Sequence, residues 1–120
     1  MRPGLQGENM SATTVIINLT PHEVHEVNSN RIWPKSQNPA RVDSKTESAG
    51  KINGIETFYT ELLPTDNLPE PRMDTYYIVS ALVLGNNPDR TDLLAPGVPV
   101  RDSEGRVIGT SGFRRNKPTL

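Results

Sequence analysis

The chain has 120 residues, the size of a single domain, and it carries a net charge of −1 and no cysteine. The lack of cysteine excludes disulfides, zinc–thiolate sites and cysteine nucleophiles, and it fits a reducing cytosol. General nucleic-acid-binding domains carry a strong positive excess, so we expect no DNA or RNA polymer as a partner. Apolar residues form only 33% of the chain, so we expect a thin core and a homo-oligomer.

The two ends of the chain differ in composition from its middle. Residues 1–12 contain no hydrophobic signal region, and we interpret them as a flexible extension. Residues 13–113 are expected to form a single β-rich domain, followed by a basic tail at 114–120. No run reaches the ~20 apolar residues that a membrane-spanning helix needs, so we expect no membrane partner.

The first half of the domain contains short segments that are β-branched or that alternate between apolar and polar residues. Both patterns are typical of strands, and none of these segments has the length or period of a helix. Pro21 ends the first segment, and an Asn-Ser-Asn turn follows the second. The predicted strands are residues 15–19, 23–27, 31–33, 40–44 and 54–62.

The second half opens with a proline-rich stretch, 64–74, which we predict to be a loop because proline cannot donate to a central strand. Residues 76–79 are predicted to be a strand, and 80–84 extend this strand or begin a short helix. Valines before and after the turn 102–105 predict a hairpin. Short, closely spaced strands predict a mainly β (α+β) fold: a compact antiparallel sheet or partial barrel with at most one or two short helices.

Catalytic chemistry finds little support in the sequence. His22 and His25 lie three positions apart in a predicted strand, where odd spacing directs side chains to opposite faces, so we expect no metal site. The "GTSG" segment at 109–112 is one residue shorter than a nucleophile elbow and has no histidine after it. No glycine-rich phosphate loop and no distinctive carboxylate pair is present. We therefore expect neither an enzyme nor a cofactor.

Binding chemistry finds more support after the predicted strand at 76–79. Asn86, Arg90 and Asp92 place amide, guanidinium and carboxylate groups in one short loop, the kind of segment where ligand-binding residues concentrate. Tyr77 belongs to a group of aromatic residues that could stack on a base, although at least two of that group are expected in the core. The alternative is that Asn-Asn-Pro-Asp is an ordinary turn.

Four motifs occur in order along the chain: "INLTPHEV", "LPEP" before "YYIVS", "RTDLLAP" and "VRDSEGRVIG". As a set they resemble a family of small proteins encoded by phages and prophages, and in particular they resemble the first-type Thoeris anti-defence proteins. The resemblance covers residues 16–113. It implies an oligomeric sponge in the host cytoplasm that binds cyclic ADP-ribose isomers, and in some members of that family also cyclic oligonucleotides, without cleaving them.

The resemblance also implies roles for particular residues. In that family arginines hold phosphates, an aromatic residue stacks on adenine, and Asn and Asp contact ribose or base. The residues of matching type here are Arg41, Asn86, Arg90, Asp92, Arg101, Arg106 and Tyr77. Two rival hypotheses stay open: a virion structural or head-decoration protein, and a protein that inhibits a host enzyme by direct contact.

Overall fold

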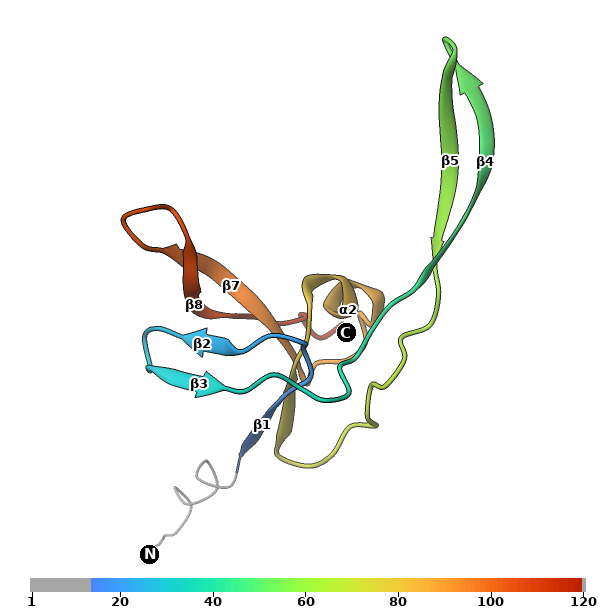
Figure 1. Cartoon of the computed structure of the whole chain (residues 1–120). Helices are drawn as coiled ribbons and strands as arrows, with labels where there is room; N and C mark the ends of the chain where they lie inside the picture. The colour runs from blue at the N-terminus through green and yellow to red at the C-terminus, as the bar shows by residue number, and fades with distance from the viewer. Residues whose placement is uncertain (1–13, 120) are drawn as a thin grey trace, which may run out of the picture.

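The computed structural model describes residues 14–119, which form eight strands and one short helix (Figure 1). Six strands form a mixed sheet that curls into a nearly closed barrel, and the other two form a separate hairpin. The predicted mainly β fold is confirmed. The elements are β1 (Val15–Asn18), β2 (Val24–Glu26), β3 (Arg31–Trp33), β4 (Ser44–Ile52), β5 (Ile55–Leu62), β6 (Thr75–Ile78), α2 (Ala81–Asn86), β7 (Leu93–Arg101) and β8 (Val107–Arg114).

The barrel strands lie in the order β1-β6-β7-β8-β2-β3. β1, β6 and β7 are parallel to one another, and β8 returns antiparallel to β7. β2 runs parallel to β8 and forms an antiparallel hairpin with β3. The spacing of the strands in the sequence predicts an antiparallel sheet, but the sheet is mixed. The parallel β6–β7 pair requires a crossover connection, and α2 provides it.

The interior of the barrel is a small apolar cluster to which all six strands contribute. Ile78 and Leu94 are buried at its centre, and Trp33 packs edge-to-face on Phe113 with ring centroids 5.8 Å apart. This geometry is favourable for aromatic pairs and adds to the burial of apolar area. The strand residues of the cluster are Ile16, Val24, Trp33, Tyr76, Ile78, Leu94 and Phe113.

A second cluster covers the outer face of the parallel strands. Tyr77 and Val79 point to this face, while their neighbour Ile78 points into the barrel, so the β6 segment is buried on both sides. Burial on both faces explains why residues 76–79 are apolar without alternation. Val83 and Leu84 of α2 close the cluster, because the helix lies over β7.

The pairing between β2 and β8, which we call the β2–β8 joint, is the shortest strand pairing in the barrel. It consists of one residue pair, Glu26 with Thr110, and a hydrogen bond of 2.9 Å from the Val27 amide to the Thr110 carbonyl. A Cβ atom on Gly109 would lie 2.6 Å from the His25 carbonyl oxygen. Glycine is therefore required at position 109 for the two strands to meet.

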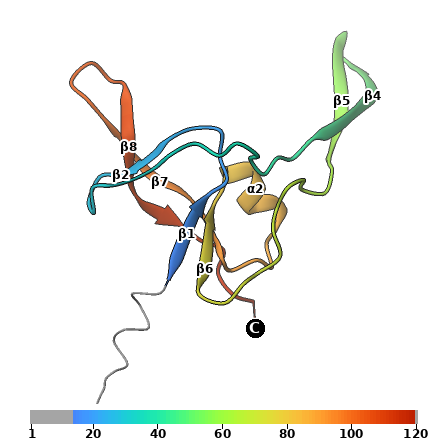
Figure 2. The same ribbon diagram turned by 60° about the horizontal axis from the view of Figure 1, so that its bottom comes forward.

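β4 and β5 form a hairpin that projects away from the barrel, and we call residues 44–62 the arm (Figures 1 and 2). The strands are nine and eight residues long, with a bulge between Ser48 and Gly50. The arm gives the chain extents of 71 × 41 × 30 Å and a radius of gyration of 18.6 Å. A compact domain of this length has a radius of about 13 Å.

The structure corrects one strand prediction, adds one strand that was not predicted and resolves one ambiguity. Residues 40–43 form only an isolated bridge, Arg41 with Asp66, and β4 occupies 44–52, which the sequence pattern did not indicate. Residues 81–86 are helical because the Ser80 side chain accepts a hydrogen bond from the Val83 amide and caps the first turn. The predicted extension at 1–12 lies outside the described residues.

Candidate functional site

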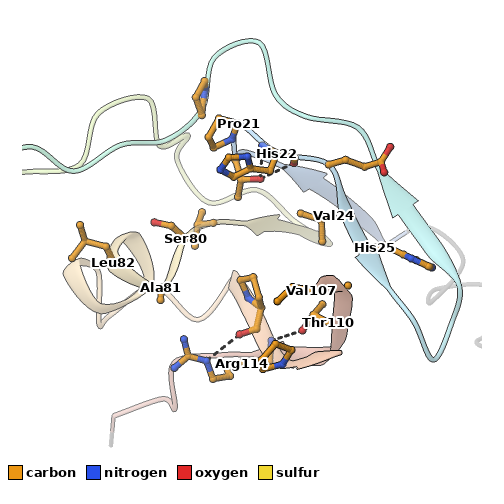
Figure 3. A pocket seen from close by; sticks show the side chains of 18 of the residues that line it. Pro21, His22, Val24, His25, Ser80, Ala81, Leu82, Val107, Thr110 and Arg114 are labelled. Atoms are coloured by element: carbon orange, nitrogen blue, oxygen red, sulfur yellow. Dashed lines mark hydrogen bonds between the residues drawn. The ribbon is translucent and has the colours of Figure 1, made fainter. Parts of the chain in front are cut away.

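A groove of about 1100 Å³ lies between the segment entering β2, the start of α2 and the β7–β8 hairpin (Figure 3). Pro21 and His22 stand on one wall, and Val107 and Arg114 stand on the opposite wall. A volume of this size exceeds that of most drug-sized ligand sites, so it would hold a nucleotide or dinucleotide. The lining residues are 20–25, 39–42, 79–82, Pro96, Gly97, Pro99, 107–110 and Arg114.

The wall that carries His22 is shaped by the "INLTPHEV" segment. The buried Asn18 side chain donates to the carbonyls of His22 and Pro34, at 2.8 and 2.9 Å. Its oxygen accepts hydrogen bonds from the Thr20 amide and hydroxyl, at 2.9 and 2.8 Å. One amide side chain therefore fixes the turn after β1 and places His22 on the rim of the groove.

Arg41 and Arg114 bring positive charge to the groove from distant parts of the sequence. The backbone of Arg41 is held by paired hydrogen bonds with Asp66, at 3.1 and 2.8 Å, and its side chain is solvent-exposed. The Arg114 Nε donates to the Pro96 carbonyl at 3.2 Å, and its side chain is also exposed. Arg41 is therefore the one residue of the predicted set that lines this groove.

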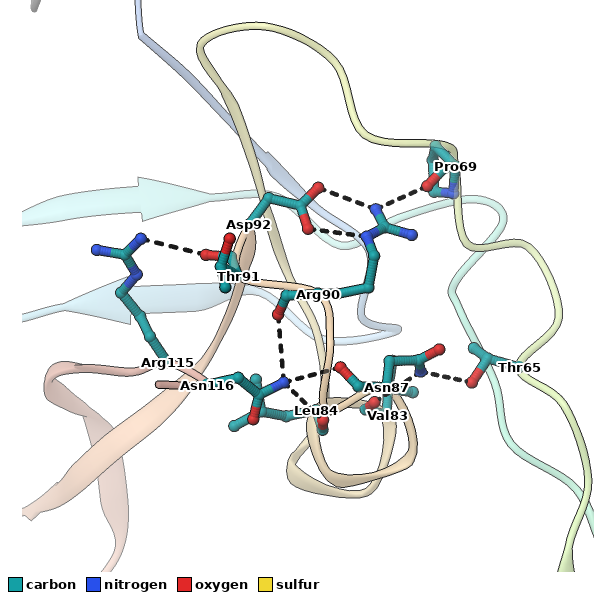
Figure 4. Close-up of polar contacts among 10 residues, drawn as sticks. All are labelled: Thr65, Pro69, Val83, Leu84, Asn87, Arg90, Thr91, Asp92, Arg115 and Asn116. Atoms are coloured by element: carbon teal, nitrogen blue, oxygen red, sulfur yellow. Dashed lines mark hydrogen bonds and ion pairs between the residues drawn. The ribbon is translucent and has the colours of Figure 1, made fainter. Parts of the chain in front are cut away.

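Arg90 and Asp92 form a bidentate ion pair of 2.8 and 2.9 Å, and Arg90 also donates to the Pro69 carbonyl (Figure 4). Both side chains are more than 80% shielded from solvent. The Arg90 hydrogen bond lowers the pKa of Asp92, and the same bond raises the pKa of Arg90. The pair fixes the proline-rich loop against the start of β7, and its two charges neutralise each other.

Asn86 and Asn87 hold the base of the arm. The Asn86 side chain donates to the Leu63 carbonyl at 2.9 Å, and Asn86 and Asn87 both donate to the Thr65 hydroxyl, at 3.1 and 2.8 Å. These residues and Arg90 border a second hollow of about 630 Å³, which also carries Glu61 and Glu70. Two carboxylates beside one paired guanidinium make this hollow a poor phosphate site.

The other predicted residues lie apart from the groove. Tyr77 is 1% exposed in the outer core, and its hydroxyl has no hydrogen-bond partner in the part of the chain that the structure describes. Arg101 donates to the Gly105 carbonyl, and Arg106 pairs with Asp102 at 3.0 Å, so both stabilise the turn of the β7–β8 hairpin. The structure does not bring the seven predicted residues into one site.

Two structural residues of this region were missed by the sequence analysis. The Asn116 side chain donates to the carbonyls of Leu84, Asn87 and Arg90, at 3.1, 2.9 and 3.2 Å (Figure 4). It caps the C-terminal end of α2, where carbonyl groups lack helical partners. Arg115 lies over the Tyr76 ring, with its guanidinium carbon 5.2 Å from the ring centroid. No local pattern signals either contact, because the partners are distant in sequence.

Glu26 is the third missed residue, and it strengthens the short β2–β8 joint. Its buried carboxylate accepts hydrogen bonds from the amides of Ser29 at 2.7 Å, Gly112 at 2.9 Å and Asn28 at 3.2 Å. Hydrogen bonding by the Ser29 side chain, and then by the Gly112 and Ser29 amides, lowers the pKa of Glu26 from 4.5 to about 2. A carboxylate that receives several amide hydrogen bonds strongly favours its charged form.

Residues 14–119 contain no cluster of three or more His, Asp or Glu side chains arranged to hold a metal ion. Within the same residues no helix has the length and apolar character needed to cross a membrane. Comparison of the chain with protein-family models, curated proteins and solved structures finds no match.

Proposed function

We propose that the protein is a binding protein that captures a small anionic ligand of the cyclic nucleotide type in the groove and holds it without cleavage. One observation carries this proposal: two arginines from distant segments, Arg41 and Arg114, line one groove of about 1100 Å³. Guanidinium groups suit bidentate contact with phosphate oxygens, and the apolar wall residues suit the faces of a base or ribose.

The ligand class follows from the motif resemblance to the first-type Thoeris anti-defence proteins. A cyclic ADP-ribose isomer carries two phosphates, which matches two arginines on one groove. Capture of such a signal in the host cytoplasm would starve a bacterial immune effector of its activator. A sponge requires tight binding, and nanomolar affinity corresponds to roughly −12 kcal/mol. Two charge-assisted contacts and an enclosed base are the interactions that would supply it.

The direct test is thermal unfolding with cyclic ADP-ribose isomers and, separately, with cyclic dinucleotides. At a ligand concentration of 100 times the dissociation constant, binding stabilises the native state by about 2.7 kcal/mol, which raises the melting temperature by roughly 10 °C. The double substitution Arg41→Ala with Arg114→Ala should weaken binding at least about 100-fold, because each charge-assisted hydrogen bond contributes about 1.5–3 kcal/mol. Arg72→Ala is the matched control, since Arg72 is exposed and lies outside the groove.

A second double substitution, Arg101→Ala with Arg106→Ala, tests the placement of the site. If it abolishes the thermal shift while the groove variant retains it, the ligand binds at the β7–β8 turn and the groove assignment is wrong. The absence of any shift with wild-type protein, at concentrations far above the expected affinity, would reject the whole proposal because a native-state ligand must stabilise the native state.

The alternative function, a virion structural or head-decoration protein, is favoured by the projecting arm. Phe58 and Tyr59 expose 58% and 67% of their surface on a hairpin outside the barrel. Exposed apolar side chains of this kind are typical of assembly contacts. Mass spectrometry of denatured, freshly purified protein separates the two functions, because a sponge would release a co-purified nucleotide and an assembly protein would release none.

A further inference from the structure

The arm carries five of the twelve large hydrophobic residues that are exposed among residues 14–119. Ile52 and Ile55 flank its turn and are 65% and 67% exposed, and the others are Phe58, Tyr59 and Leu62. A two-stranded hairpin with no third strand and no helix against it is only marginally stable in water. Within residues 14–119 the arm pairs with no third strand, and no other strand or helix packs extensively on it. A partner that covers the arm would therefore stabilise it.

One face of the arm is uncharged over the half nearest the barrel. Side chains alternate between the two faces along each strand, so Phe58 and Leu62 share a face, together with the opposing Ser44 and Ser48. The threonines Thr46 and Thr60 lie between them. The opposite face carries Tyr59 with the charged residues Lys45, Glu47 and Glu61. The face with Phe58 is therefore the one suited to burial.

The base of the arm is fixed in direction by contacts just beyond the end of β5. The Leu63 amide donates to the Asp43 carbonyl at 2.9 Å, immediately beyond the paired strands. Asn86 then ties the Leu63 carbonyl to α2 at 2.9 Å, and Asn87 ties Thr65 at 2.8 Å. A hairpin anchored in this way is presented at a set angle, which is what a specific docking contact requires.

The groove offers a surface of matching chemistry on the same chain. Leu82, Val107 and Ile108 line it and are each at least half exposed. Val42 also lines the groove, only two positions before the arm begins at Ser44. The end of the groove is therefore continuous with the base of the arm, so a two-fold axis near this point would place each arm along the groove of the other copy.

We propose that the protein forms a two-fold dimer by arm exchange, in which the Phe58 face of each arm lies along the groove of the second copy.

Area favours a second copy as the occupant. One arm face is about 30 Å long and about 10 Å wide, or roughly 300 Å². A single arm in a single groove falls below the roughly 800 Å² per partner of stable interfaces, whereas a reciprocal exchange doubles the area and approaches that size.

The exchange also completes the ligand site, and this part rests on the proposed function. The groove is lined by no Phe, Tyr or Trp among residues 14–119, and Tyr77 is buried in the core. An arm crossing the groove would bring the partner's Phe58 over the bound ligand as a stacking surface. The dimer itself requires no ligand, so it is tested with ligand-free protein.

The first test measures molar mass by light scattering across a dilution series of the ligand-free full chain. The wild type is expected to be a dimer that dissociates on dilution. Phe58→Lys should give a monomer, whereas the matched control Tyr59→Lys, which places the same charge on the opposite face of the arm, should remain a dimer. Both positions are exposed in the single chain, so neither change should unfold the barrel, which circular dichroism would verify.

The second test probes the groove side of the same contact. Ile108→Lys should also give a monomer, while Val98→Lys, on the same hairpin but outside the groove, should not. Mixing the Phe58→Lys and Ile108→Lys chains should give only weak dimers, detectable at high protein concentration, because one intact arm can enter one intact groove but the second contact is lost.

Two outcomes would overturn the arm-exchange dimer: a monomeric wild type at high micromolar concentration, or equal effects of Phe58→Lys and Tyr59→Lys. If Phe58→Lys loses the dimer and the wild type binds no ligand, the arm exchange is supported and only the proposed function is rejected. A monomeric wild type that still binds ligand would reject the exchange alone.

Discussion

The barrel and the arm are both built from strands, but the barrel buries its apolar side chains and the arm exposes them. In the barrel each of the six strands directs a residue into one interior cluster, and Ile78 is fully buried there. In the arm the comparable side chains face solvent, and Ile55 is 67% exposed. This difference fits the proposed arm-exchange dimer, in which the barrel would be the folding unit and the arm the binding element.

The most direct test of this difference is the same isoleucine-to-alanine substitution in both regions. Ile78→Ala should lower the free energy of unfolding by about 2–5 kcal/mol, because it leaves a cavity in the barrel interior. Ile55→Ala should change it by less than about 0.5 kcal/mol, as exposed substitutions do. Urea denaturation in the Phe58→Lys background keeps dimer formation out of the measurement. Equal losses would show that the arm contributes to the folding unit.

Glycine substitutions test how closely other backbone atoms approach two glycines of the folded chain. A Cβ on Gly97 would lie 2.7 and 2.8 Å from the carbonyl oxygens of Ser111 and Gly112, so Gly97→Ala should destabilise the protein by about 1–3 kcal/mol. A Cβ on Gly85 in α2 would meet no atom within 4 Å. Gly85→Ala should therefore stabilise the protein by about 0.4–1 kcal/mol. Thermal unfolding of both variants checks the pair, and a loss at both sites would contradict it.

Acid should weaken the barrel through Glu26. The folded-state pKa of about 2 lies below the ordinary value of 4.5, so the stabilisation is complete above pH 4.5 and is lost as the pH falls toward 2. Glu26→Gln should lower stability at pH 7 and reduce the further loss between pH 5 and pH 3. Urea midpoints at the three pH values test this. An acid dependence identical to that of wild type would exclude Glu26 as its source.

The arm base can be loosened without touching the barrel core. Asn86→Ala removes the hydrogen bonds to Leu63 and Thr65, each contributing about 0.5–1.5 kcal/mol. We expect faster hydrogen exchange of the β4–β5 amides and weaker dimerisation, with little change in exchange for β6 and β7. Mass-spectrometric exchange would resolve the segments. Uniformly faster exchange across the barrel would instead assign Asn86 to the folding unit.

The smallest effect is expected at Tyr77. Its buried hydroxyl has no partner within the described residues, so Tyr77→Phe removes a polar group whose burial is unfavourable. We expect unfolding stability to be unchanged or to rise by up to about 1 kcal/mol. A clear loss on thermal unfolding would mean that the hydroxyl is hydrogen-bonded in solution.

Local patterns were sufficient for parts of the fold with local causes. Asp102 and Gly105 signal the β7–β8 turn, and alternation signals β5. β4 was missed because its sequence, SKTESAGKI, lacks apolar alternation, and it is a strand only through pairing with β5. The parallel arrangement of β1, β6 and β7 also leaves no local signal, since it depends on contacts far apart in the sequence.

The candidate site was predicted less well, and the reason is physical. Residue type identified Arg90 and Asp92 as a possible ligand pair, but their spacing equally allows them to bind each other, as they do. Arg41 was selected by type and does line the groove, whereas Arg114, at the start of the basic tail, also lines the groove but was not among the predicted site residues. Which arginines face a common space depends on how the barrel closes, and this is not encoded in any short segment.

The β2–β8 joint has a consequence for synthesis of the chain on the ribosome. Glu26 emerges from the ribosome well before the Gly112 amide that it binds, which lies 86 positions later. The barrel cannot close until Gly112 has left the exit tunnel, and such non-local closure is slow. During that interval the apolar arm is already exposed, so nascent chains on one messenger would be prone to entangle or to require chaperone protection.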